Sequence, residues 1–187
     1  MGLSRQRSER RTLELAATVA ASDNRGMSIV LRPISAAAGE ALRAGRPLVD
    51  VRVAADYPTE FSAGVGEQAV SGAGPLGPFF IHRAEDDVVV GEIGGAVISP
   101  GIVEIGYAVV RSCWGRGHAT AAVQALVARA REVAGVDRVI GHTPLDRPAS
   151  GRVLEKAGFA CVGEEQDEHE GTVLRVERWE LPVASVP

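Results

Sequence analysis

Residues 110–120 read VRSCWGRGHAT, and this stretch decides the fold more than any other part of the chain. A segment rich in β-branched residues precedes it, and a segment with apolar residues three or four positions apart follows it. The sequence therefore predicts a strand, a glycine-containing loop and a helix in succession. The first backbone N–H groups of such a helix, together with the helix dipole, favour a bound anion such as phosphate.

The loop itself contains residues that suit an anion. Gly115 and Gly117 lack Cβ atoms, which lets a ligand approach the backbone closely. Arg116 adds a positive charge, and Thr120 adds a hydroxyl donor. The spacing matches neither GxxxxGK[ST] nor GxGxxG, so a P-loop and a Rossmann dinucleotide site are both disfavoured. A lone glycine loop of this kind also occurs as an ordinary turn before a helix.

Hydrophobic periodicity and turn residues predict the elements on either side of the loop. Upstream, the sequence predicts a strand over 27–34, a helix from Ser35 to about 44, one or two helical turns after Pro58, and an antiparallel meander over 79–83, 88–98 and 102–110. Downstream, it predicts a helix of about four turns, a strand over 138–141, a helix over 149–156, and strands over 160–163 and 172–179.

The composition is typical of one ordinary globular domain. The chain has 187 residues, of which 45% are hydrophobic and 24% are charged, so a sizeable core is expected and a disordered protein is excluded. The net charge of −4 predicts no general attraction to nucleic acid or to an anionic membrane. No apolar run approaches the ~18–20 residues of a membrane helix. The two cysteines form no CxxC pair, so a cytoplasmic location is expected, and the four scattered histidines predict no metal site.

Three regions are expected along the chain. Residues 1–26 form an N-terminal extension with a short helix over residues 12–21, and residues 183–187 form a C-terminal tail. One domain covers residues 27–182. Within it, the acidic run at 164–170 is interpreted as a solvated loop, with attraction of a cationic substrate as the alternative.

Three segments together resemble the GNAT superfamily of N-acetyltransferases. Residues 114–120, WGRGHAT, resemble its acetyl-CoA pyrophosphate loop, [QR]-x-x-G-x-[GA]. Residues 148–159, PASGRVLEKAGF, resemble the N-P-A-S-x-R-V-L-E-K-x-G-F signature of the RimJ/RimL-like branch, and residues 104–107, EIGY, match a strand of that branch. The segments occur in the family's order and spacing, and the resemblance covers roughly residues 27–180.

The resemblance implies a fold and a function. The fold is an α/β (α+β) one, a mixed and mostly antiparallel sheet of about seven strands flanked by about four helices. The function is transfer of an acetyl group from acetyl-CoA to a primary amine, on a protein N-terminus or a small molecule, by direct attack in a ternary complex. No metal, nucleic acid or membrane is implied, and a homodimer is left open. A non-catalytic acyl-CoA-binding module and a simple phosphate- or nucleotide-binding protein are the alternatives.

The resemblance also implies which residues bind acetyl-CoA. They come from the strand end, the glycine loop, the helix start and the downstream signature: Val109, Val110, Arg111, Gly115, Arg116, Gly117, His118, Ala119, Thr120, Arg147 and Arg152. A backbone N–H near Val109 and Val110 is expected to stabilise the oxyanion of the tetrahedral intermediate. His118 is expected on the exposed first turn of the helix.

The expected general base is Glu104. An alkylammonium must lose a proton before it can attack a thioester, and Glu104 stands where some members of the family have a catalytic glutamate. The alternative is a solvent-facing strand carboxylate, because an α-amine needs little help near neutral pH.

Three positions depart from the family's pattern. Trp114 stands in place of the usual Gln or Arg, and Arg147 in place of the Asn before Pro-Ala-Ser. Leu154 stands where many members have a tyrosine that protonates the departing thiolate. Ser150 is then the nearest candidate for that general acid, with a helix N-cap as its alternative or additional role.

Overall fold

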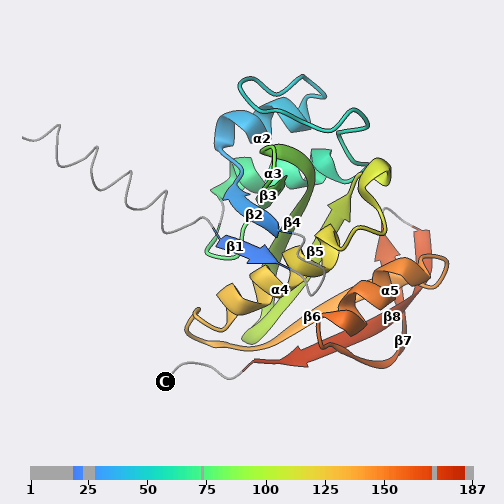
Figure 1. The fold of residues 1–187 in the computed structure, drawn as a ribbon. Coiled ribbons are helices and arrows are strands. Elements are labelled where there is room, and N and C mark those ends of the chain that lie inside the picture. Colours follow the sequence, from blue (N-terminus) through green and yellow to red (C-terminus); the bar gives the residue numbers. More distant parts are fainter. Residues whose placement is uncertain (1–18, 23–27, 73, 170–171, 184–187) are drawn as a thin grey trace, which may run out of the picture.

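The computed structural model describes residues 19–22, 28–72, 74–169 and 172–183 (Figure 1). Its strands form one sheet in the order β1-β2-β3-β4-β5-β6-β8-β7, in which β5 and β6 are parallel and every other neighbouring pair is antiparallel. The strands are β1 Val19–Ser22, β2 Ser28–Pro33, β3 Phe79–Arg83, β4 Val88–Ser99, β5 Gly101–Val109, β6 Val136–Pro144, β7 Ala160–His169 and β8 Thr172–Pro182. The helices are α2 Ala36–Arg43, α3 Ser62–Gly72, α4 His118–Ala130 and α5 Pro148–Lys156, with a 3₁₀ turn η1 at Arg111–Cys113.

Helices cover both faces of the sheet, as the alternation of side chains along β3 shows. Phe79 and Ile81 are buried in the core cluster that includes the apolar face of α4. Phe80 points the other way, into a second cluster with Leu42 of α2 and Ala69 of α3. α4 and α5 therefore lie on one face, and α2 and α3 on the other (Figure 1). In the described part of the chain, every helix is too short or too polar to cross a membrane.

An opening between β5 and β6 is the feature that positions the site. Their parallel pairing begins at Gly101 and ends where Glu104 lies beside Ile140. Beyond that point β5 continues beside β4 to Val109, and β6 continues beside β8 to Pro144. The two strands therefore part, and we call the gap between them the wedge. The crossover helix α4 begins just after β5 ends, at the wide end of the wedge.

The structure confirms the mixed, mostly antiparallel sheet with four flanking helices. The meander is present as β3, β4 and β5, and Ser35 caps α2 by accepting a hydrogen bond from the Ala38 N–H at 3.2 Å. After Pro58, α3 runs for 11 residues, which is longer than the one or two turns expected. The sheet has eight strands among the described residues, and the strand beyond the expected seven or so is β1.

Two local expectations are wrong. The helix over residues 12–21 is contradicted at residues 19–21, because these belong to β1 and pair with the edge of β2; residues 12–18 lie outside the described part of the chain. The pairing places residues 19–22 in the sheet rather than in a separate extension. The acidic run is not a loop either, since residues 164–169 continue β7 and pair with β8. Pairing the backbone in a long hairpin leaves the side chains of Glu164, Glu165 and Asp167 exposed, so their charge does not oppose the strand.

Close packing of α2 against α3 depends on two glycines. A Cβ atom at Gly66 would lie 2.6 Å from the Gly39 carbonyl oxygen and 2.8 Å from the Arg43 nitrogen. Both are backbone atoms, which cannot move aside as the end of a side chain can. Gly64, in the same helix, faces open space.

We expect Gly66→Ala to destabilise the protein by about 1–3 kcal/mol, because the added methyl group forces the helices apart. For a chain of this size that lowers Tm by roughly 2–12 °C. Gly64→Ala is the matched control; it gains about 0.5–1 kcal/mol of helix propensity without a clash. Thermal unfolding followed by circular dichroism measures both, and equal Tm values for the two variants would contradict the packing argument.

Candidate functional site

The glycine loop connects β5 to α4 as the sequence predicts. Gly115 and Gly117 have φ angles of 73° and 90°, a region that L side chains rarely adopt. Gly117 is the N-cap of α4 and has no side chain with which to cap the first turn. Arg116 is exposed, and Ala119 and Thr120 lie half-buried in that turn. The start of α4 is therefore accessible to an anion.

His118 is not on an exposed turn, contrary to the expectation; its side chain is only 1% exposed. Ala121, Ala122 and Ala125 follow it at helical spacing and are also buried. His118 therefore begins the face of α4 that packs on the sheet. Its side chain therefore faces the core and not the glycine loop.

Trp114 covers the end of β5. Its indole Nε1 donates a hydrogen bond to the Val109 carbonyl at 2.6 Å, and the Arg111 guanidinium lies 5.4 Å from the centre of the ring. The indole is nevertheless largely exposed. The residue that departs from the family's loop pattern thus lies at the edge of the wedge.

The two backbone N–H groups expected to face the oxyanion differ in direction. Val110 donates its N–H to the Val90 carbonyl at 2.9 Å, inside the sheet. In an antiparallel ladder, hydrogen-bonded and non-hydrogen-bonded pairs alternate. The bond from Val110 to Val90 flanks the pair Val109 and Gly91, which is therefore a non-hydrogen-bonded pair. The N–H of Val109 therefore points away from β4, toward the wedge. Of the two N–H groups, that of Val109 is the one that faces the wedge, whereas that of Val110 is bonded inside the sheet.

Ser150 is not the N-cap of α5. The cap is Arg147, and Ser150 lies three positions inside the helix. Its carbonyl accepts a hydrogen bond from the Tyr107 hydroxyl at 2.8 Å. Burial raises the pKa of Tyr107, so this phenol keeps its proton. Sequence reasoning missed Tyr107, although it is the last residue of the EIGY segment.

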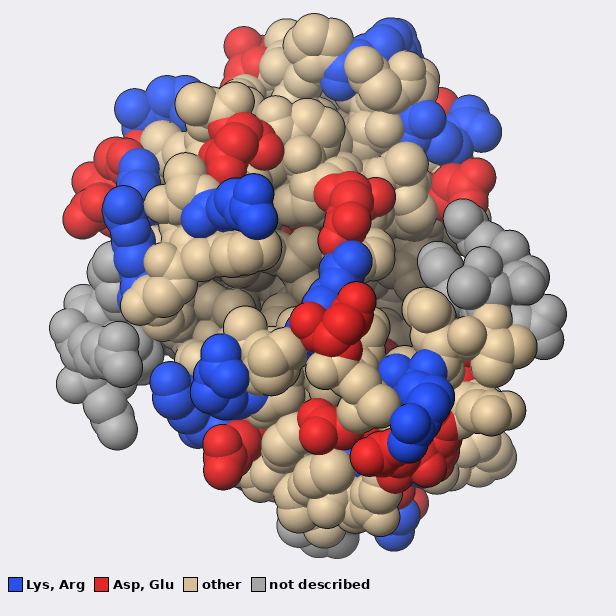
Figure 2. Space-filling view, turned by 90° about the vertical axis from the view of Figure 1, so that its right-hand side faces the viewer, with Lys and Arg blue, Asp and Glu red and all other residues tan. Residues whose placement is uncertain are grey.

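Arg147 and Arg152, the two arginines at the downstream signature, lie beside parts of the protein other than the glycine loop. Arg147 forms an ion pair with Glu60 at 2.6 Å and lies 5.8 Å from the ring centre of Phe61. Arg152 is exposed and lines a cavity of about 220 Å³ between α5 and β8. Neither forms a hydrogen bond or ion pair with residues 110–120 among the described residues. In Figure 2 the molecular surface is hollowed beside a central row of side chains, in which acidic and basic residues lie next to one another.

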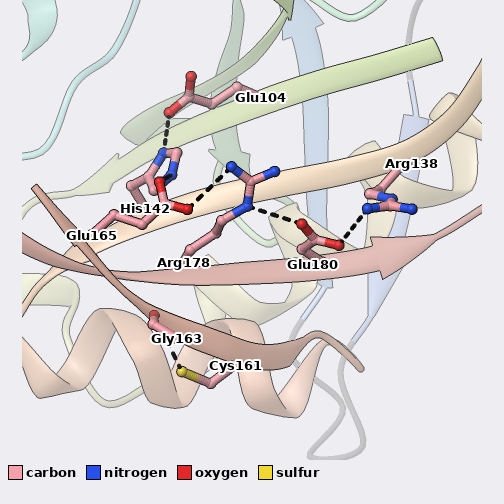
Figure 3. Close-up of polar contacts among 8 residues, drawn as sticks. All are labelled: Glu104, Arg138, His142, Cys161, Gly163, Glu165, Arg178 and Glu180. Carbon is pink, nitrogen blue, oxygen red and sulfur yellow. Dashed lines mark hydrogen bonds and ion pairs between the residues drawn. The ribbon is translucent and has the colours of Figure 1, made fainter. Parts of the chain in front are cut away.

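Glu104 lies on the sheet face opposite to α4 and α5. Its Oε1 is 2.7 Å from Nδ1 of His142, and Nε2 of that histidine is 3.5 Å from Oε2 of Glu165 (Figure 3). The Glu104 side chain is 38% exposed, so it can reach a solute. Gly106, the next residue on this face, is exposed, and a Cβ atom there would meet nothing within 4 Å. An open surface thus adjoins the carboxylate.

A second carboxylate on this face is fully buried. Glu92 of β4, paired with Ala108, is 1% exposed. It accepts hydrogen bonds from the hydroxyls of Tyr57, Thr59 and Ser62, at 2.7 and 3.0 Å for the first two. Burial raises the pKa of Glu92, and these hydrogen bonds oppose that shift. Glu92 thus anchors the segment before α3.

The same segment is tied to the glycine loop. Asp56 accepts hydrogen bonds from the Ser112 N–H at 2.8 Å and from its hydroxyl at 2.6 Å, which lowers the pKa of Asp56. Residues 56–62 therefore connect the loop, β4 and the start of α5. Sequence reasoning found no readable pattern there, because each contact is made to a distant part of the chain. Within the described residues no group of three or more His, Cys, Asp or Glu side chains is placed to hold a metal ion.

Comparison with known proteins supplies the family. A model described as "Acetyltransferase (GNAT) domain" matches residues 28–160. No curated protein matches the chain at a significant level.

Solved structures show the same fold at low identity. The ribosomal α-N-protein acetyltransferase RimL in complex with coenzyme A has a TM-score of 0.64 and 18% identity, with 89% of this chain and 98% of that chain covered. The microcin C7 self-immunity acetyltransferase MccE, in complex with acetyl-CoA and AMP, has a TM-score of 0.62 and 16% identity over 83% and 92% of the two chains. Mutant forms of the spermidine/spermine N-acetyltransferase SpeG from Vibrio cholerae give 0.59 and 14%, over 82% and 94%.

Proposed function

The chain belongs to the GNAT family of acetyltransferases, and from this premise we propose that it transfers an acetyl group from acetyl-CoA to a primary amine by direct attack in a ternary complex. One observation carries the proposal. The wedge has an accessible helix start at its wide end and, on one face of the sheet, a carboxylate beside an open surface. An anionic cofactor and a cationic acceptor therefore have separate approaches to the same gap. The RimJ/RimL-like signature at residues 148–159 supports placement in that branch.

The glycine loop and the start of α4 are proposed to hold the pyrophosphate. The positive φ angles of Gly115 and Gly117 turn the backbone into the helix, and Arg116 contributes an exposed charge. Acetyl-CoA supplies the thioester, whose carbonyl carbon is the electrophile. The N–H of Val109 is the donor we assign to the oxyanion, because it faces the wedge.

Glu104 is proposed to accept the proton of the attacking amine. A lysine-type amine has a pKa of ~10.4 and an α-amine one of ~7.7–8.0, so both are wholly or partly protonated at pH 7. When an N–H bond breaks, its electron pair stays on nitrogen for attack on the thioester, and the proton binds a carboxylate oxygen. RimL and SpeG, by their names, act on a protein α-amine and on a polyamine, which supports an amine acceptor as the class.

The departing thiolate is proposed to take its proton from Ser150 or from water. Leu154 is buried in the core and offers no hydroxyl. Ser150→Ala should lower kcat about 10–100-fold and leave the KM for acetyl-CoA nearly unchanged, because a thiolate needs only modest protonation. Tm should stay constant, since Arg147 and not Ser150 caps the helix. Wild-type kcat in this variant would assign the proton to water instead.

Release of free thiol from acetyl-CoA over a panel of primary amines tests the function. Thiol release that depends on one class of amine supports the proposal. Tight binding of CoA in calorimetry without thiol release from any amine would support the non-catalytic module. Equal affinity for ATP and CoA would favour a general phosphate site.

A further inference from the structure

Six charged or titratable side chains form one continuous chain across β5, β6, β7 and β8 (Figure 3). It runs Glu104, His142, Glu165, Arg178, Glu180, Arg138. Beyond His142 the nitrogen–oxygen distances are 3.5, 3.3, 2.9 and 2.7 Å in that order. From Glu165 to Arg138, acidic and basic groups alternate, so each of these four charges attracts the next.

Two of the six side chains stand outside the charge balance of the other four. The negative charges of Glu165 and Glu180 are balanced by the positive charges of Arg178 and Arg138, so the charges of these four groups sum to zero. Glu104 and His142 remain at the open end of the chain. Their nitrogen–oxygen distance of 2.7 Å is within the range of a charge-assisted hydrogen bond.

The sheet explains why the two residues meet. Glu104 is paired with Ile140 at the last point where β5 and β6 adjoin. His142 lies two residues further along β6 and therefore on the same face. Its side chain is only 18% exposed, with Glu104 on its Nδ1 side and Glu165 on its Nε2 side. The contact with Glu104 therefore orients the imidazole, while its buried Nε2 has no hydrogen-bond partner among the described residues.

We propose that His142 is a positioning residue for the acetyl transfer, an inference that rests on the proposed function. A glutamate side chain alone would sample several rotamers. Donation from the His142 Nδ1–H to Oε1 fixes the Glu104 carboxylate and leaves Oε2 for the amine. The N–H bond of the amine then breaks, the electron pair stays on nitrogen, and an O–H bond forms at Oε2. Oε2 of Glu165 lies 3.5 Å from Nε2, on the other side of the ring.

An ordinary surface ion pair would act differently. Exposed pairs contribute little to stability, and a pair that orients no reacting group leaves kcat unchanged. A positioning residue changes kcat, because it acts on the orientation of the base, and leaves the binding of acetyl-CoA unchanged. Its loss should also be repaired by a side chain that restores the donor.

Three variants test the proposal by thiol release. His142→Phe removes the donor and should lower kcat about 10–100-fold at an unchanged KM for acetyl-CoA. His142→Asn places an amide N–H near the Nδ1 position and should recover most of the rate. Glu180→Gln breaks the same chain away from Glu104 and should behave as wild type. Wild-type kcat in His142→Phe, or equal impairment of His142→Asn and His142→Phe, overturns the proposal.

A spectroscopic measurement separates this proposal from the proposed function. The Nδ1 proton of His142 should give a low-field, slowly exchanging proton resonance in the wild type, and Glu104→Ala should abolish it. Absence of that resonance in the wild type overturns the positioning role. If it is present but no amine yields free thiol, the acetyltransferase assignment fails while the pairing of the two side chains stands.

Discussion

Glu104→Gln is expected to lower kcat for acetyl transfer by about 100-fold or more at pH 6, because glutamine keeps the shape of the side chain but cannot take the proton of the amine. The Oε1 atom of glutamine can still accept a hydrogen bond from His142, so the variant tests basicity rather than position. The affinity for CoA should not change, since Glu104 lies away from the glycine loop. Thiol release at saturating substrate, followed from pH 6 to pH 9, measures the effect.

The pH dependence of the defect should also report the acceptor class. An α-amine, with a pKa of ~7.7–8.0, loses its proton to water by pH 9, so the defect should largely disappear there. A lysine-type amine, with a pKa of ~10.4, stays protonated, so the defect should persist. Glu132→Gln, an exposed change just after the far end of α4, is the control. A wild-type rate for Glu104→Gln throughout this range would show that solvent or another group takes the proton.

Gly117→Asn is expected to weaken CoA binding by about 100-fold or more. The φ angle of 90° strains a β-branched residue severely, whereas asparagine tolerates the left-handed region, so the loop should still form. The new side chain would occupy the approach to the first N–H groups of α4. Losing two charge-assisted hydrogen bonds of about 1.5 kcal/mol each corresponds to the stated factor.

Gly135→Asn is the matched control for that variant. Gly135 has a φ angle of 80°, faces open space and lies at the opposite end of α4. Asparagine at position 135 therefore has a conformational cost similar to that at position 117, but it lies away from the glycine loop. Calorimetric titration with CoA measures both variants. Equal affinities for the two, whether wild-type or weakened, would argue against a cofactor site at the glycine loop.

Local sequence patterns predicted the parts of the fold that depend on near neighbours. The strand, loop and helix around residues 110–120 follow from periodicity and glycine placement, and Ser35 caps α2 from three residues away. Glu104 was identified through the motif that contains it. The incorrect expectations concern burial and pairing. His118 and the run at 164–169 have polar sequences but lie on a packed helix face and in a paired strand.

Ser150 shows how a local signal can mislead. A serine before a helical run is a common N-cap, yet Pro148 already occupies the first turn, so the cap falls on Arg147. The alanine-rich segment at 19–21 is similar, since its helix propensity is outweighed by pairing with the edge of β2. In both cases the competing interaction is not visible in the residue itself.

The sequence by itself determined the glycine loop, the helix that follows it and the presence of a carboxylate on the neighbouring strand. Only the tertiary structure decided the partners of that carboxylate and of residues 56–62. Glu104 and His142 are 38 positions apart, Tyr57 and Glu92 are 35 apart, and Asp56 and Ser112 are 56 apart. No helix or strand period links residues at such distances. Their contacts follow from the register between strands, above all from the parallel pairing that ends at Glu104 and opens the wedge.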